Sequence, residues 1–425
     1  MSIPKTPEIS NELFGGVLVS DGAGLYPGLE LLNLVYGCAE GILADSESPK
    51  YVRTGHDFAR RLVWDAEKFA DENLGELAFV NVGASTVVAH LLESLQLKVP
   101  ERTSKNWEAA HFFPYTRSLI HWDARLRKGK SEPSIERRYL RGGGALAHKV
   151  LRCDPDVARR DLIRSGFSAL MPENGSTALD TLAGVLAHHG HPTDPVTDDI
   201  ECRAEVRDDA LDNYFRDGVA SIVSHRQLSS TSRVKAIMNW TGFWLAIVQK
   251  DRAASRLGRE APEIIVDCGS RPSQLRRESV RALKDVMAQL ADAAEDCLPP
   301  GEALVPKSRG DIVGFFTRTC AWVGLLNSLK GRRHFVIKLD LLEALVMAHV
   351  PAGAELSFEA FSSLLCRKYG LIIGRDSAAQ TAILSYMDAS VFEDNEEAFA
   401  SQLYAAGLMH AYSDATRMVG TGTSK

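Results

Sequence analysis

One stretch of the chain decides the fold, and it reads TSRVKAIMNWTGFWLAIVQKDRAASRL at residues 231–257. Its apolar residues recur at intervals that place them along one broad face of an α-helix. They are Val234, Ile237, Met238, Trp240, Phe243, Trp244, Ile247 and Val248. Gly258 follows, and glycine commonly ends a helix. Because the apolar stripe is wide, we expect this helix to be a central packing element.

Shorter elements are expected to surround this helix. The run EIIVDCG at residues 263–269 is apolar and has turn signals at both ends, which is typical of a buried strand. A helix is expected over residues 273–297, and another over residues 177–189. Pro299, Pro300 and Gly301 make the clearest break in the chain. The predicted fold class is therefore predominantly α (α+β).

Helices and short strands alternate beyond the break. Residues 334–339 are expected to form a strand, and Asp340 with Glu343 fits a capping box that opens a helix at residues 341–350. Ser357 caps a second helix that Gly370 ends. A short strand at residues 371–374 and helices near residues 377–388 and 396–408 follow. The order helix, turn, helix, strand predicts a winged-helix-like module.

Length and composition indicate a multi-domain globular protein. The chain has 425 residues, which predicts two to four domains at about 100–200 residues each. Hydrophobic residues make up 45% and charged residues 24%, which are ordinary globular values. We expect a mostly helical domain with a basic Gly-rich loop at residues 1–165. A central helical domain with one buried strand is expected at 166–298, and an acidic winged-helix-like domain at 311–425.

The cysteines and the hydropathy favour a cytoplasmic protein. The seven cysteines are far apart and form no CxxC pair, so we expect them to be reduced. The first residues lack the basic and apolar segments of a secretory signal. No stretch approaches the ~20 apolar residues that span a bilayer. We therefore expect no membrane contact.

Charge is strongly segregated along the chain, although the net charge is only −6. Residues 117–164 hold 13 basic and 6 acidic residues, whereas residues 194–217 hold 9 acidic and 3 basic. Residues 226–281 are basic again, with 11 basic and 5 acidic residues, and residues 339–417 are acidic, with 4 basic and 11 acidic residues. This pattern favours a phosphate-binding surface together with a protein-binding one. The alternative is a set of solvated helix faces.

A glycine triplet beside basic residues is the predicted nucleic-acid site. Backbone N–H groups in a Gly-rich loop and the positive end of the following helix attract anions, and arginine adds charge-assisted contacts. The loop lacks the Gly-Lys-Ser/Thr ending of a Walker A motif. The predicted contact residues are Arg137, Arg138, Arg141, Gly142, Gly143, Gly144 and Lys149.

The strand end at Asp267 is the position where catalysis would be expected. Carboxylates at the carboxyl end of a strand, beside a helix N-terminus, are common positions for chemistry. Glu263 with Asp267 could bind Mg²⁺, but both lie on one strand and no following Glu-x-Lys completes a restriction-nuclease core. The alternative is a buried strand without chemistry. We predict no catalytic residue, no metal site and no cofactor.

Three segments carry a family resemblance: residues 335–346, 369–374 and 407–415. They resemble poorly characterised bacterial proteins that are encoded with ATPases or helicases in anti-phage defence clusters. The resemblance implies a protein partner, which would be such an ATPase or helicase. It transfers no catalytic residues.

The leading hypothesis is a non-catalytic, nucleic-acid-associated subunit of a bacterial DNA-processing or anti-phage defence complex. Its basic middle would contact DNA or RNA phosphates, and its acidic end would dock a partner. Two alternatives stay open. One is a metal-dependent enzyme that acts on nucleic acid or nucleotide, and the other is a docking scaffold without nucleic-acid contact.

Overall fold

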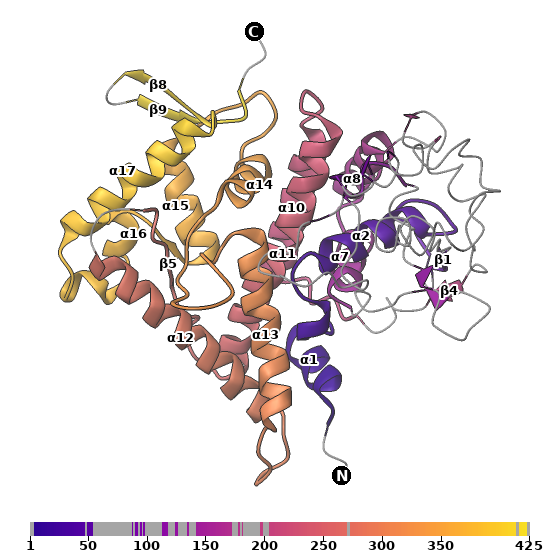
Figure 1. The fold of residues 1–425 in the computed structure, drawn as a ribbon, viewed down its shortest axis with the longest axis horizontal. Coiled ribbons are helices and arrows are strands. Elements are labelled where there is room, and N and C mark those ends of the chain that lie inside the picture. The colour runs from indigo at the N-terminus through magenta and orange to yellow at the C-terminus, as the bar shows by residue number, and fades with distance from the viewer. Residues whose placement is uncertain are drawn as a thin grey trace.

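The computed structural model describes residues 4–46, 49–53, 142–171, 204–269, 273–413 and 416–422, together with short pieces and single residues between 87 and 198. Twelve α-helices are assigned within these residues, and the strands there are short (Figure 1). The chain is therefore predominantly helical, as the sequence predicts. No helix in this described part is long and apolar enough to cross a membrane.

The central element is α11 (Ser230–Arg256), which confirms the helix predicted at residues 231–257. Its first turn is closed by Ser229, whose hydroxyl accepts a 3.0 Å hydrogen bond from the N–H of Ser232. Twenty of its 27 residues are buried, because helices cover it on several sides. The indole N–H groups of Trp240 and Trp244 donate to backbone carbonyls of α10 (Ala210–Ser224), which orients both rings in the core.

Helices from the whole length of the chain gather around α11 (Figure 1). The N-terminal ones are α1 (Thr6–Phe14), α2 (Tyr26–Gly37), α7 (Gly143–Arg152) and α8 (Val157–Leu170), with a 3-10 turn, η1 (Ser20–Gly22). The later ones include α12 (Ser273–Asp296), α13 (Pro306–Val323) and α14 (Leu339–His349). Buried apolar residues from Ile9 to Val419 form one connected cluster. The division into domains at residues 1–165, 166–298 and 311–425 stays a prediction.

The C-terminal part combines helices with two small sheets. After α14 come β6 (Leu356–Ser357), α15 (Phe358–Tyr369), β7 (Leu371–Ile372), α16 (Arg375–Ala379), the 3-10 turn η5 (Ala382–Ser385), α17 (Ala389–Ala405), β8 (Met409–Ser413) and β9 (Thr416–Val419). One antiparallel sheet has the strand order β6-β9-β8. The other sheet pairs β7 in parallel with β5 (Ile264–Ile265), the strand predicted at residues 263–269.

Local signals placed some boundaries correctly and others wrongly. The hydroxyl of Ser357 accepts from the N–H of Ala360 at 3.2 Å, and Gly370 ends α15 with a φ of 69°, as predicted. Residues 334–339 do not form a strand, because Phe335 makes only one bridge, to Leu326. Its N–H donates instead to the hydroxyl of Ser279 in α12. The predicted capping box is also wrong, since α14 begins before Asp340.

Two further strand pairs lie in the N-terminal half. β1 (Tyr51–Arg53) pairs with β4 (Val196–Asp198), and β2 (Ala124–Arg125) pairs with β3 (Ser134–Ile135), both antiparallel. Of the helix predicted at residues 177–189, only residues 177, 178 and 181 belong to the part that the structure describes.

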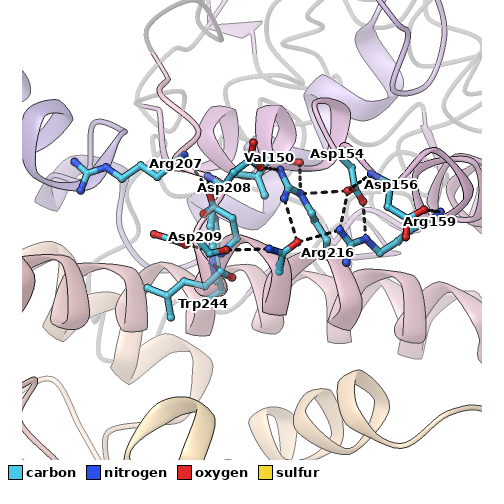
Figure 2. Close-up of polar contacts among 12 residues, drawn as sticks. Val150, Asp154, Asp156, Arg159, Arg207, Asp208, Asp209, Arg216 and Trp244 are labelled. Atoms are coloured by element: carbon cyan, nitrogen blue, oxygen red, sulfur yellow. Dashed lines mark hydrogen bonds and ion pairs between the residues drawn. The ribbon is translucent and has the colours of Figure 1, made fainter.

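Charged side chains are buried where the start of α8 meets α10 (Figure 2). Arg216 has no exposed side chain, and it donates to the carbonyl of Val150 at 2.9 Å and to the carboxylate of Asp208 at 2.5 Å. Arg159 binds the buried Asp154 through two hydrogen bonds of 2.6 and 2.7 Å. Asp154 also lies 3.8 Å from Nε of Arg216, so this buried carboxylate joins the start of α8 to α10, and removing either partner would leave an uncompensated buried charge.

Oppositely charged segments of the sequence pair with each other inside the fold. Arg159, from the basic residues 117–164, also contacts Asp217 at 2.6 Å. Arg252, from the second basic segment, contacts Asp212 at 2.8 Å and Asp209 at 3.0 Å. The acidic segment at residues 194–217 is therefore partly neutralised by the two basic segments. Segregation along the sequence does not translate directly into opposite surface patches.

Candidate functional site

The described part of the predicted nucleic-acid loop lies at the N-terminus of α7. Gly142 precedes the helix with a φ of 120°, a conformation that favours glycine. The N–H groups of Gly142 and Gly144 donate to the carboxylate of Glu30, at 3.1 and 2.8 Å. Glu30 belongs to α2 and is 1% exposed. The anion at this helix N-terminus is therefore a side chain of the same chain.

Close packing gives the glycines a structural role. A Cβ at Gly144 would lie 2.4 Å from the Cβ of Glu30, so a larger residue would push α2 away from α7. Lys149 donates to the carbonyl of Ala204 at 2.6 Å. A phosphate bound to these amides would have to displace Glu30. Three predicted contact residues lie outside the described part of the chain: Arg137, Arg138 and Arg141. Nucleic-acid binding by this loop stays a prediction.

The end of β5, the other position singled out from the sequence, holds a buried carboxylate. Asp267 is 4% exposed. Its Oδ1 accepts a 2.9 Å hydrogen bond from the N–H of Gly269, and its Oδ2 accepts a 2.8 Å bond from Nε of Arg276. Nε2 of His334 lies 3.5 Å from the same Oδ2. The strand end thus carries a cluster of one acidic and two basic side chains.

An asparagine of α17 holds this strand end in place. The side-chain oxygen of Asn395 accepts from the N–H of Cys268 at 2.9 Å. Its amide nitrogen donates to the carbonyls of Val266 and Ile373, both at 2.9 Å. One fully buried side chain therefore joins α17 to β5 and to the end of β7, and it fixes the backbone beside Asp267.

A cavity of about 580 Å³ opens beside Asp267. Its walls come from three parts of the chain that are distant in sequence: the end of β5 with the start of α12, the segment from Asn327 to Leu342, and the end of α17. Polar groups gather at one end, where Asp267, Arg276 and His334 lie. Most of the remaining wall is apolar. This division is typical of ligand pockets, which combine apolar walls with a few polar groups.

The enzyme alternative would place a metal ion at this strand end. No group of three His, Cys, Asp or Glu side chains that could hold a metal ion occurs among the residues that the structure describes. Asp267 is bonded to Arg276, which competes with a cation for its oxygens. Burial raises the pKa of the Cys268 thiol well above its usual value, so this sulfur is not a thiolate nucleophile at neutral pH.

Basic side chains form a separate surface on the outside of α12. This basic face comprises Arg277, Arg281, Lys284, Lys330, Arg332 and Arg333. All are exposed except Arg333, which is half-buried and donates to the sulfur of Met287 at 3.9 Å. That contact brings the loop at residues 330–333 against α12. The acidic residues of α12 that lie next to these cations in the sequence are Glu278 and Asp285.

The sequence pointed to one part of the cavity, and to the basic face only through the positive charge of residues 226–281. Asp267 and Arg276 follow a recognisable strand, but His334 and Lys338 come from beyond the break at residues 299–301 and have no local motif. The loop at residues 330–333 was likewise outside every predicted site. Its run of Lys330, Arg332 and Arg333 beside a glycine was the one signal that could have identified it.

No known protein family, curated protein or solved structure matches the chain.

Proposed function

We propose that this protein is a non-catalytic subunit that binds the phosphate backbone of DNA or RNA through its basic face. The observation that carries the proposal is the convergence of two basic segments, from α12 and from residues 330–333, on one surface. Six basic side chains stand there against two acidic ones. Phosphate contacts of lysine and arginine release counterions and need no sequence motif.

The spacing on α12 suits a row of phosphates. Arg277, Arg281 and Lys284 are four and three residues apart, so they lie on one side of the helix and span about 10 Å along it. Duplex DNA carries about six phosphate charges over that length. Among the residues that the structure describes, the polar partners of Arg277 and Arg281 are the local Ser273 and Glu278, and the contact between Arg281 and Glu278 is a long 3.7 Å. Exposed ion pairs of this kind contribute little to stability, so a phosphate can readily replace the carboxylate as the partner of the arginine.

Fluorescence anisotropy with labelled duplex and single-stranded oligonucleotides tests the proposal. Binding should weaken steeply between 50 and 200 mM salt. Changing Arg277, Arg281 and Lys284 to glutamine should lower the slope of log affinity against log salt by about 2 to 3. The matched control changes three exposed cations elsewhere, Lys5, Arg226 and Arg367, and should leave the slope nearly unchanged. Absent or salt-insensitive binding of the unaltered protein would refute the proposal.

A second role, docking of a protein partner, is supported by the C-terminal part. The order α14, β6, α15, α17 and the β8–β9 hairpin, with the sheet order β6-β9-β8, supports a winged-helix-like arrangement with β7 and α16 inserted. In that arrangement α17 takes the place of the helix that enters DNA in winged-helix proteins. Its residues Glu393, Asp394, Glu396 and Glu397 would repel phosphates and favour a basic protein surface.

Two of these acids already have local partners. Glu393 binds Arg375 and Glu397 binds Arg417, each at 2.7 Å, while Asp394 is exposed. Co-expression with an ATPase or helicase of the kind that the sequence resemblance implies, followed by size-exclusion chromatography, tests the docking role. Asp394→Lys should reduce co-elution more than Glu302→Lys, a control on an exposed loop. Equal co-elution of both variants would argue against α17 as the docking surface.

A further inference from the structure

The cavity beside Asp267 has an apolar wall that is left open to solvent. Val336, Ile337, Leu339 and Leu342 contribute one side, and Ala405 and Ala406 at the end of α17 contribute the other. Leu339 is 51% exposed although it stands at the start of a helix whose other leucines are buried. An exposed leucine at the edge of a cavity is stabilised when a ligand covers it.

The charged side chains that line the cavity carry an excess of positive charge. The negative charge of Asp267 is matched by Arg276, which lines the cavity and whose side chain is 52% exposed. Lys338 also lines the cavity, and its Nζ donates to the neutral carbonyl of Asn327 at 3.0 Å. No carboxylate within salt-bridge distance of Lys338 occurs among the residues that the structure describes. The ammonium of Lys338 can therefore pair with an anionic ligand.

Both oxygens of Asp267 serve to hold this end of the cavity in shape. Oδ2 accepts from Nε of Arg276 and Oδ1 from the N–H of Gly269, so the guanidinium is anchored through one nitrogen. Arginine has four further N–H donors, arranged in a fork that matches a carboxylate or a phosphate. The ammonium of Lys338 lines the same cavity and is bonded to Asn327, which in turn contacts His334, and it adds a second charge-assisted contact.

From this arrangement we propose that the cavity binds a small organic anion, with its carboxylate or phosphate monoester at Arg276 and Lys338 and its apolar body against Leu339, Leu342 and Ala405. The volume of about 580 Å³ is within the range of about 300–1,000 Å³ that is usual for small-molecule sites. The inference is independent of the proposed nucleic-acid binding, because the apolar wall and these two cations lie outside the basic face.

The probe for the test is 8-anilinonaphthalene-1-sulfonate, an aromatic anion whose fluorescence rises on binding. Folded protein should bind it at one site, and octanoate or octyl phosphate should displace it, whereas octylammonium should not. The relative potency of octanoate and octyl phosphate tells which head group fits better. Absence of binding, or equal displacement by octylammonium, would overturn the proposal.

Several substitutions in the cavity, rather than a single one, test whether the probe binds there. Lys338→Gln and Arg276→Gln should each weaken binding about tenfold, the size expected for one charge-assisted hydrogen bond. Ala405→Trp should abolish it by filling the cavity, and Leu339→Ser should weaken it with no change of charge. Both of these residues are exposed, so the fold should tolerate the changes.

The control is Arg277→Gln, which removes an equal charge from the neighbouring position on the basic face and should leave probe binding unchanged. Unaltered binding in Ala405→Trp and Lys338→Gln would refute the site. Oligonucleotide binding, measured on the same variants, should persist in Leu339→Ser and Ala405→Trp. The two proposals can therefore fail separately.

Discussion

Glu30→Ala should destabilise the fold by about 3 kcal/mol. The carboxylate of Glu30 accepts hydrogen bonds from the N–H groups of Gly142 and Gly144 at the N-terminus of α7. Alanine would leave both buried donors without this acceptor, at about 1–3 kcal/mol for each. Loss of a negative charge at the helix N-terminus would add to that cost, by up to about 2 kcal/mol in a buried setting. The structure can relax partly around the smaller side chain, so we expect a loss of unfolding free energy near the lower end of the summed costs.

Glu30→Gln separates the charge from the acceptor. Glutamine keeps one oxygen for one amide but presents an NH₂ group to the other, so it should lower the free energy of unfolding by about 1–2 kcal/mol. Urea unfolding measures both variants, followed by tryptophan fluorescence and by circular dichroism, because coincident transitions justify a single free energy. Glu302→Gln, on an exposed loop, is the matched control and should change stability by less than about 0.5 kcal/mol.

A loss below about 1 kcal/mol in Glu30→Ala would refute this reasoning, because the two amides would then have another acceptor or ready access to water. The same variants also bear on the glycine loop as a phosphate site. If Glu30 and a phosphate compete for the amides, Glu30→Gln should bind oligonucleotides more tightly than the unaltered protein in the anisotropy assay. Equal affinity would indicate that these amides serve packing alone.

Two other predictions concern glycines within helices and the histidine at the end of α14. Gly218→Ala should lower the free energy of unfolding by about 1–3 kcal/mol, because a Cβ there would lie 2.4 Å from the Trp240 ring. A Cβ at Gly310 would meet open space, so Gly310→Ala should raise the free energy of unfolding by up to about 1 kcal/mol. The midpoints of urea unfolding compare the two variants. Burial lowers the pKa of His349 from 6.5 to about 3, and its Nε2 lies 2.9 Å from the hydroxyl of Tyr369. The contribution of neutral His349 to the free energy of unfolding should therefore be fully present above pH 6.5. It should fall by about 1.4 kcal/mol per pH unit from there toward pH 3. His349→Gln should flatten this acid limb between pH 7 and 5, and an unchanged slope would contradict the assignment.

The sequence determined the elements that depend on local chemistry. The apolar spacing from Val234 to Val248 predicted α11 to within one residue at each end, because a helix that must be covered on most sides needs apolar residues around most of its surface. Ser357 and Gly370 predicted the ends of α15, since capping involves backbone groups only a few residues away. Asp267 was identified as a strand-end carboxylate for the same reason. All these signals lie within one turn or one strand of the feature they predict.

Only the tertiary structure decided what these residues do. The glycine triplet fits a phosphate loop in sequence, but Glu30, more than 100 residues earlier, accepts its hydrogen bonds in the fold. The acidic and basic segments that suggest opposite patches are partly joined through Arg252 and Asp212. His334 and Lys338 reach the Asp267 cavity across the proline break. A carboxylate, an arginine or an amide has the same local pattern whether it meets solvent, a ligand or its own chain, because the partner is brought there by packing of distant helices.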